Sequence, residues 1–258
     1  MATYLDTIIA RHRRAAALDV RPLAPMVEQA LAMAPIRGFR EALTHVSHLA
    51  VISEVKRRSP SKGDLNAGLD PAALARDYER GGASCVSVLT DEESFGGSVA
   101  DLQAARAACS LPVLRKDFTV CERDVVDARL MGADCVLLIA AALEPRELIE
   151  LHRLAEAVGL DVLVEIHDEA ELDVALAAGA NLVGVNQRDL VTFQVDHERA
   201  LRMAGVMPAS VVRVAESGVR GPADAASLYV AGYHAVLVGE TLVTSGDPAA
   251  AIQGLIAV

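Results

Sequence analysis

The chain has few aromatic residues and no tryptophan: phenylalanine and tyrosine together make up only 3% of its 258 residues. It also has no long apolar run, because the longest, at 135–143, is much shorter than the roughly 18 residues that cross a bilayer. Near the amino terminus, the basic residues from Arg11 to Arg14 follow the apolar positions, which is the reverse of a secretory leader. We therefore expect a cytoplasmic protein with no membrane partner.

Metal-ligand and disulfide patterns are also missing from the sequence. The four cysteines have no C-x-x-C spacing, and the seven histidines include no H-x-x-x-H pair. Without a secretory context, free thiols are expected in place of disulfides or a zinc site. We predict no metal and no cofactor.

Positive charge is in the minority, with 24 lysines and arginines against 35 acidic residues and a net charge of -11. This balance argues against nucleic acid or an anionic membrane as the main partner. An anionic ligand would therefore need a site that gathers lysine, arginine and helix N-termini in one place.

What the chain does have is aliphatic residues, which dominate a hydrophobic fraction of 52%. Helical patterns such as 71–80 and 147–154 separate short runs rich in valine, leucine and isoleucine. These runs recur at intervals of roughly 20 to 35 residues, at 49–54, 84–89, 111–115, 134–139, 161–166, 181–186, 211–215 and 234–238. Eight strand-helix units predict a (β/α)8 TIM barrel, with a doubly wound open sheet as the alternative.

Glycine precedes several of these runs, and its position supports one repeated unit. A glycine after a helix is typical of a C-cap in the left-handed region. The glycines concerned are Gly82, Gly132, Gly159, Gly179 and Gly232. No linker rich in glycine, proline or serine divides the chain, so we predict a single domain over 1–258.

The first 45 residues precede the eight units, which fill 46–258. The amphipathic spacing of Leu5, Ile8, Ile9 and Ala17 predicts an N-terminal helical extension that packs at one end of the barrel. A partner-binding arm is the alternative.

Charged residues stand at the ends of several predicted strands, where barrel enzymes carry their chemistry. Glu54 and Lys56 lie two residues apart and share one face of the strand end, and Lys116 and Glu165 hold equivalent places later. Lysines beside glutamates in a partly dry pocket keep protonation states that suit general acid and base catalysis. A solvated ion pair is the alternative for Glu54 and Lys56.

Two glycine-containing turns predict a phosphate site. Ser217-Gly218 follows the seventh strand and Gly239-Glu240 the eighth, where backbone N–H groups bind phosphate in many barrels. Ordinary turns are the alternative. The basic loop 57–70 is expected to act as a lid over an anionic substrate, or to be a disordered surface loop.

Six segments resemble the indole-3-glycerol-phosphate synthase family, in the family's order. They are EVKRRSPSKG (54–63), LTDEESFGGS (89–98), LPVLRKDF (111–118), VEIH (164–167), GVNQRDL (184–190) and AESG (215–218). The resemblance implies that 1-(2-carboxyphenylamino)-1-deoxyribulose 5-phosphate, a small anionic phosphosugar, closes to an indole ring with loss of carbon dioxide and water. This is a step of tryptophan biosynthesis that needs no cofactor or metal. Weak association with neighbouring enzymes of the pathway is a further partner hypothesis.

The resemblance also implies roles for individual residues. Lys116 matches the general acid that protonates the ketose oxygen, and Glu165 the carboxylate that transfers a proton during dehydration. Lys56 matches the lysine that meets the substrate carboxylate, and Glu54 orients it. The remaining matches are Asn186 and Arg188 for the anthranilate part, Phe118 for substrate binding, Glu216 and Ser217 for the ribulose chain and phosphate, and Ser59, Gly218, Gly239 and Glu240 for the phosphate neighbourhood. We expect the Glu240 side chain to turn away from the phosphate.

Two positions depart from the family pattern. Gln187 stands where the family usually has asparagine, and Arg123-Asp124 where it usually has Tyr-Gln, so the wall near the aromatic ring is expected to differ. These departures motivate one rival, a non-catalytic barrel that binds a phosphate ligand. A second rival, phosphoribosylanthranilate isomerase, would place a cysteine where this chain has Glu54.

Overall fold

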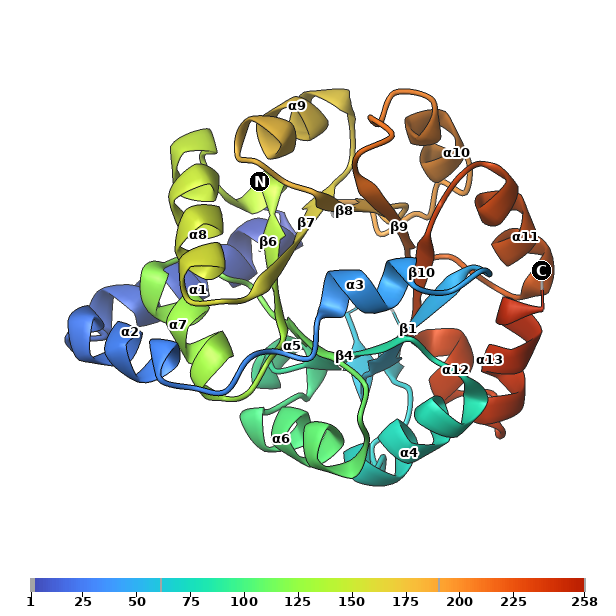
Figure 1. The fold of residues 1–258 in the computed structure, drawn as a ribbon, viewed down its shortest axis with the longest axis horizontal. Coiled ribbons are helices and arrows are strands. Elements are labelled where there is room, and N and C mark those ends of the chain that lie inside the picture. Colours follow the sequence, from blue (N-terminus) through green and yellow to red (C-terminus); the bar gives the residue numbers. More distant parts are fainter. Residues whose placement is uncertain (1–2, 61, 190, 258) are drawn as a thin grey trace.

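A computed structural model describes residues 3–60, 62–189 and 191–257. Ser61 and Leu190, which belong to two of the motifs above, lie outside the described residues. Eight parallel strands form a closed barrel, in which the first strand pairs with the last (Figure 1). They are β1 Ala50–Val55, β4 Cys85–Leu89, β5 Val113–Lys116, β6 Cys135–Ile139, β7 Asp161–Ile166, β8 Leu182–Asn186, β9 Val212–Glu216 and β10 Ala235–Val238.

The closure confirms the predicted TIM barrel and rules out the open sheet. The predicted strand limits agree with the observed ones to within two residues. Helices cover the outside of the ring (Figure 1). They are α4 Pro71–Gly81, α6 Val99–Ala108, α7 Glu122–Leu130, α8 Pro145–Ala157, α9 Glu169–Ala177, α10 Arg199–Ala204, α11 Pro222–Val230 and α13 Pro248–Ile256. Short elements between them are β2 Arg58–Ser59, β3 Gly63–Asp64, α5 Glu92–Phe95, the 3-10 turn Ala140–Ala142 and α12 Glu240–Val243.

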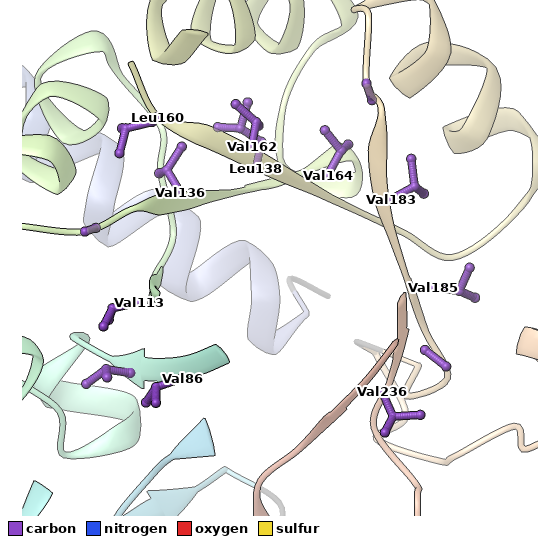
Figure 2. Close-up of a cluster of buried hydrophobic side chains, with 14 of the residues drawn as sticks. Val86, Val113, Val136, Leu138, Leu160, Val162, Val164, Val183, Val185 and Val236 are labelled. Carbon is purple, nitrogen blue, oxygen red and sulfur yellow. The ribbon is translucent and has the colours of Figure 1, made fainter. Parts of the chain in front are cut away.

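Alternation along the strands sorts the apolar residues into two cores. Side chains such as Val136, Leu138, Val162 and Val164 point outward from the ring and meet the helices (Figure 2). Side chains at the positions between them, such as Leu137, point inward and fill the barrel. Because successive residues of a strand face opposite sides, the same alternation aims the last inward position of each strand at the mouth of the barrel.

The predicted helix caps are confirmed. All five glycines have a positive φ, between 82° and 99°. After α4, for example, the Gly82 N–H donates to the Glu79 carbonyl and the Ala83 N–H to the Tyr78 carbonyl. A glycine adopts this left-handed conformation at no steric cost, so each helix ends sharply before the next strand.

The N-terminal extension forms three helices, α1 Tyr4–Leu18, α2 Leu23–Leu31 and α3 Phe39–Thr44. The prediction that they pack at one end of the barrel is wrong, because they serve both ends. Helix α3 crosses the amino-terminal end of the strands, where Phe39 and Leu43 join the inner core (Figure 1). Helix α1 lies at the opposite end, and α2 packs on α7 between them. The buried apolar residues of the extension are therefore used within the chain and do not form a partner-binding arm.

Candidate active site

One cavity of about 250 Å³ opens at the carboxyl ends of the strands. All the predicted site residues line it: Glu54, Lys56, Ser59, Lys116, Phe118, Glu165, Asn186, Arg188, Glu216, Ser217, Gly218, Gly239 and Glu240. Glu54, Lys116, Glu165, Asn186 and Glu216 share the same place in their strands, the last inward position before the loop. Strand alternation thus gathers residues from distant parts of the chain into one layer.

Lys116 stands at the centre of the charged layer. Its Nζ lies 3.4 Å from Oε2 of Glu165 and 4.0 Å from Oε2 of Glu216. Burial alone would lower the pKa of Lys116, but the charges of Glu165, Glu216 and Glu54 outweigh burial and raise it. The ammonium is therefore held protonated in a nearly dry pocket, ready to donate a proton.

Glu165 is held as a carboxylate. It is 1% exposed, and Nδ2 of Asn186 donates to its Oε1 at 3.0 Å. Burial alone would raise the pKa of Glu165, but the charges of Lys116 and His167 and the hydrogen bond from Asn186 lower it. Lysine and carboxylate therefore face each other in the states that an acid and a base require.

Glu216 has the opposite electrostatic environment. Burial, followed by the charge of Glu165, raises its pKa well above the usual range, although Lys116 acts against this. Oε1 of Glu216 has no hydrogen-bond partner among the described residues and occupies space that a Cβ on Gly184 would fill. Glycine on the neighbouring strand thus makes room for this carboxyl group.

Glu54 and Lys56 form the second acid-base pair of the cavity. The Nζ of Lys56 contacts Oε2 of Glu54, as the two-residue spacing predicts. The backbone carbonyl of Glu54 accepts a hydrogen bond from the buried Tyr78 hydroxyl at 2.8 Å. A Cβ on Gly239 would overlap the Glu54 carboxylate, so this glycine also makes room for an acid. The Lys56 side chain is 17% exposed and lines the cavity.

Two pairs of aromatic side chains, which together we call the aromatic wall, line the cavity. Of the four phenylalanines and four tyrosines in the chain, Phe95, Phe118, Phe193 and Tyr4 line it. The Phe95 and Phe118 rings lie 6.2 Å apart, and Tyr4 of α1 meets Phe193 edge to face at 5.4 Å. Sequence reasoning missed all but Phe118. Phe95 lies in the segment 89–98 that resembles the family, so it could have been found from the sequence. Tyr4 and Phe193 lie outside the segments that resemble the family.

The turns that follow β9 and β10 supply a part of the lining that is built from backbone. Ser217 and Gly218 follow β9 with φ of 64° and 74°, and Gly239 precedes the first turn of α12. Ser217 is one of two non-glycine residues with positive φ among those described, which marks a constrained turn. The Glu240 carboxylate lies 3.6 Å from the Lys62 ammonium. The glycines and the first turn of α12 allow backbone N–H groups to face an anion here.

The expectation that Gln187, Arg123 and Asp124 alter the cavity wall is wrong. Gln187 is 2% exposed and its Nε2 donates to the Ser217 carbonyl at 2.7 Å, outside the cavity. Asp124 accepts hydrogen bonds from the N–H groups of Val120 and Cys121 and so caps α7. Arg123 donates from Nε to the Arg21 carbonyl at 2.7 Å. These side chains complete the packing around their loops.

The basic loop 57–70 carries the short hairpin of β2 and β3 and is held by its arginines. Arg57 pairs with Asp101, and Nη2 of Arg58 donates to the Glu92 carbonyl at 2.8 Å. These contacts belong to the described part of the loop, 57–60 and 62–70, and the lid role stays a prediction. The two arginines anchor the loop to α5 and α6, and are therefore already engaged by groups of the protein.

His12, Asp91 and Asp117 form one cluster whose residue types could ligate a metal. Nε2 of His12 lies 2.9 Å from Oδ2 of Asp91, and Arg11 contacts the same oxygen. Nη2 of Arg115 donates to Asp117 at 2.9 Å. Because these cations already neutralise both carboxylates, the cluster fits a clasp that ties α1 to the barrel better than it fits a metal.

Comparison with known proteins identifies the family to which the chain is similar. The model of the family described as indole-3-glycerol phosphate synthase matches residues 5–255. An indole-3-glycerol phosphate synthase of Beutenbergia cavernae is 51% identical over 99% of this chain and 95% of its own length. The protein named indole-3-glycerol phosphate synthase 2 of Streptomyces coelicolor is 52% identical over 92% of both chains.

Solved structures give a more distant likeness. An N-acetylmannosamine-6-phosphate 2-epimerase from Clostridium perfringens superposes with a TM-score of 0.60 over 77% of this chain and 89% of its own, at 14% identity. A thiamine phosphate pyrophosphorylase from Pyrococcus furiosus gives 0.59 over 80% and 93%, at 15% identity. At this level of identity the likeness shows the fold alone.

None of the described helices has the length and apolar character needed to span a membrane.

Proposed function

This chain belongs to the indole-3-glycerol phosphate synthase family, and we propose that its cavity closes the indole ring of 1-(2-carboxyphenylamino)-1-deoxyribulose 5-phosphate. The reaction releases carbon dioxide and water, which makes the enzyme a carbon-carbon lyase of the carboxy-lyase type. It serves tryptophan biosynthesis, and we expect it to act in the cytoplasm.

One observation carries the proposal: a single cavity combines an aromatic wall, an acid-base layer and a backbone anion site. The aromatic residues of the chain are scarce, yet Tyr4, Phe95, Phe118 and Phe193 all line it. Ser217, Gly218, Gly239 and Glu240 line it after β9 and β10, with lysines and glutamates in the same cavity. A substrate with an aromatic ring at one end and a phosphate at the other fits this arrangement.

In the proposed ring closure, Lys116 donates its proton to the ketose oxygen. The aromatic carbon that bears the carboxylate then attacks the activated carbonyl carbon, and a carbon-carbon bond forms. Loss of carbon dioxide returns the electron pair of the broken bond to the ring. The raised pKa of Lys116 keeps the donor charged until the oxygen develops negative charge.

Dehydration follows, and we assign its proton transfers to Glu165 and Lys56. Glu165, ionised beside Lys116, accepts the proton that the ring system must lose, while the new hydroxyl leaves as water. Lys56, neutralised by Glu54 in the free enzyme, meets the substrate carboxylate before decarboxylation, and afterwards donates the proton with which the hydroxyl leaves as water. Proton transfer and charge stabilisation are within the reach of these side chains, so the proposal invokes no metal or cofactor.

Asn186 and Arg188 are assigned to the anthranilate part of the substrate. Asn186 also holds Glu165, and Nη1 of Arg188 donates to the Phe193 carbonyl at 3.0 Å, which links the polar and aromatic sides. Ser59 and the turns at Ser217-Gly218 and Gly239-Glu240 are assigned to the phosphate. The Glu240 carboxylate near Lys62 supports the expectation that it points away from the anion.

The two rivals receive less support. A binder that has lost catalysis was suggested by Gln187 and Asp124, but neither residue lines the cavity. A phosphoribosylanthranilate isomerase would need its cysteine at the mouth of the barrel. Here Cys85 and Cys135 begin their strands, at the opposite end from Glu54.

Indole fluorescence tests the proposal, because the chain itself contains no tryptophan. Purified protein mixed with the carboxyphenylamino-deoxyribulose phosphate should produce a steady rise. We expect Lys116→Met and Glu165→Gln each to lower turnover by roughly 10²- to 10⁴-fold, since each removes a proton donor or acceptor of the transition state. No rise from the wild type, together with tight binding by calorimetry, would favour the binder instead.

A further inference from the structure

His167 is a buried titratable group that the proposed reaction does not use. It follows Glu165 by two residues, so both side chains lie on the same side of the chain at the end of β7. Its side chain is only 12% exposed. Nε2 has no hydrogen-bond partner among the described residues and lies 3.9 Å from Oε1 of Glu165.

The other side of the ring is fixed by Glu171 on α9. Nδ1 of His167 lies 3.1 Å from Oε2 of Glu171, and the His167 backbone N–H donates to the same oxygen at 2.8 Å. Glu171 is itself anchored, because its N–H donates to Asp168 at the N-terminus of α9. A carboxylate at Nδ1 sets the tautomer and orientation of an imidazole, which leaves Nε2 directed toward Glu165.

The charges around His167 favour its cationic form. Burial alone would lower the pKa of His167, but the hydrogen bond to Glu171 and the charges of Glu165 and Glu171 raise it. Arg199 on α10 acts in the opposite direction. The ring is thus faced by two acids, Glu165 on β7 and Glu171 on α9, and by one base, Arg199 on α10.

We propose that His167 is a positioning residue whose imidazolium, braced by Glu171, keeps Glu165 ionised and oriented. This inference rests on the proposed role of Glu165 as a base. Linkage makes the effect reciprocal: a proton on His167 lowers the pKa of Glu165, and the Glu165 charge raises the pKa of His167 by the same amount. Loss of the imidazolium must therefore move the acidic limb of the pH profile to higher pH.

The first test is the pH dependence of kcat/KM in His167→Gln, a neutral side chain of similar reach. We expect the acidic limb to move up by about one pH unit, as for one charge at this distance in a solvated environment. Turnover should fall roughly tenfold below the limb and approach the wild type above it, with KM within about twofold. The matched control is His45→Gln just after α3, because the exposed His45 ring lies outside the cavity and its loss should change nothing. A His167→Gln profile that superposes on the wild type overturns the proposal.

The second test needs no catalysis. Nuclear magnetic resonance can follow the titration of the His167 ring in the wild type, Glu165→Gln and Glu171→Gln. The pKa of His167 should fall in both variants, because each removes a negative charge that faces the ring. An unchanged pKa in Glu165→Gln overturns the coupling, even if His167→Gln itself does not fold. Because this result is independent of turnover, it also separates failure of the coupling from failure of the proposed synthase reaction.

Discussion

The two ends of the barrel differ in how their buried acids are paired. At the amino-terminal end, α3 inserts Phe39 and Leu43 into the inner core, and both are almost completely buried. The buried Asp134 beside this end has all the partners it needs, including the N–H groups of Arg37 and Val113 and the guanidinium of Arg106. At the carboxyl end, Glu216 and His167 each keep an atom without a partner among the described residues.

This difference shows how the chain can hold costly charges without losing its fold. A buried carboxyl group without partners costs free energy, and so does a residue such as Ser217 at positive φ. The apolar inner core, the layer between strands and helices, and the closed end supply the stability that tolerates these costs. The open end can then be arranged for proton transfer, which is the usual division of work in a TIM barrel.

The largest effect on stability is expected from breaking the closed end. Phe39→Ala removes a fully buried ring from the inner core and should lower the free energy of unfolding by about 3–5 kcal/mol. Turnover per folded molecule should stay within about twofold, because Phe39 lies outside the cavity. Chemical denaturation and the indole assay measure the two quantities. Leu31→Ala, on the exposed side of α2, is the control and should cost less than about 0.5 kcal/mol. If turnover per folded molecule fell by tenfold or more in Phe39→Ala, the separation of the two ends would be contradicted.

The next effect comes from crowding the open end. A Cβ in Gly184→Ala would overlap Oε1 of Glu216 and lie 3.1 Å from its Cδ, so the carboxyl group must move. We expect a loss of about 1–3 kcal/mol in stability from overpacking, with turnover down roughly tenfold or more. Shortening the acid in Gly184→Ala/Glu216→Asp should recover most of the stability, because the two changes act on one space.

Gly254→Ala on α13 is the matched control for the glycine change. The nearest atom to its added Cβ is Pro222 Cγ at 3.6 Å, an ordinary contact. Alanine also favours the helix, so this variant should be neutral or slightly more stable. If the double variant were no more stable than Gly184→Ala, the overlap with Glu216 would not be the cause.

The sequence predicts the strands and the charged layer well for a common physical reason. Strand alternation is local, so a charged residue at the last inward position, such as Lys116 or Glu165, can be found by counting from an apolar run. Five of the helix ends were equally readable, because a glycine in the left-handed region marks each of those five.

The aromatic wall could not be read in the same way. Tyr4 reaches the cavity only because α1 folds across the mouth of the barrel, and Phe193 stands in a loop with a φ of 59° that no glycine announces. Both placements depend on tertiary packing. The same limit explains why the extension was expected at one end, and why Gln187 and Asp124 were expected in the wall.

The smallest effect on function is expected from a change at Asp124. This change tests whether Asp124 lies outside the wall of the cavity, as the structure indicates. Asp124→Gln replaces the aspartate that caps α7 with the residue usual in the family, whose neutral amide oxygen is a weaker acceptor for the same two N–H groups, so stability should fall by no more than about 1 kcal/mol. KM and turnover should stay within about twofold, because the side chain lies outside the cavity. Phe118→Leu, whose ring does line the cavity, should instead raise KM several-fold as ring contacts are lost. A several-fold change of KM in Asp124→Gln would return this position to the substrate wall and show that the sequence-based expectation had been correct.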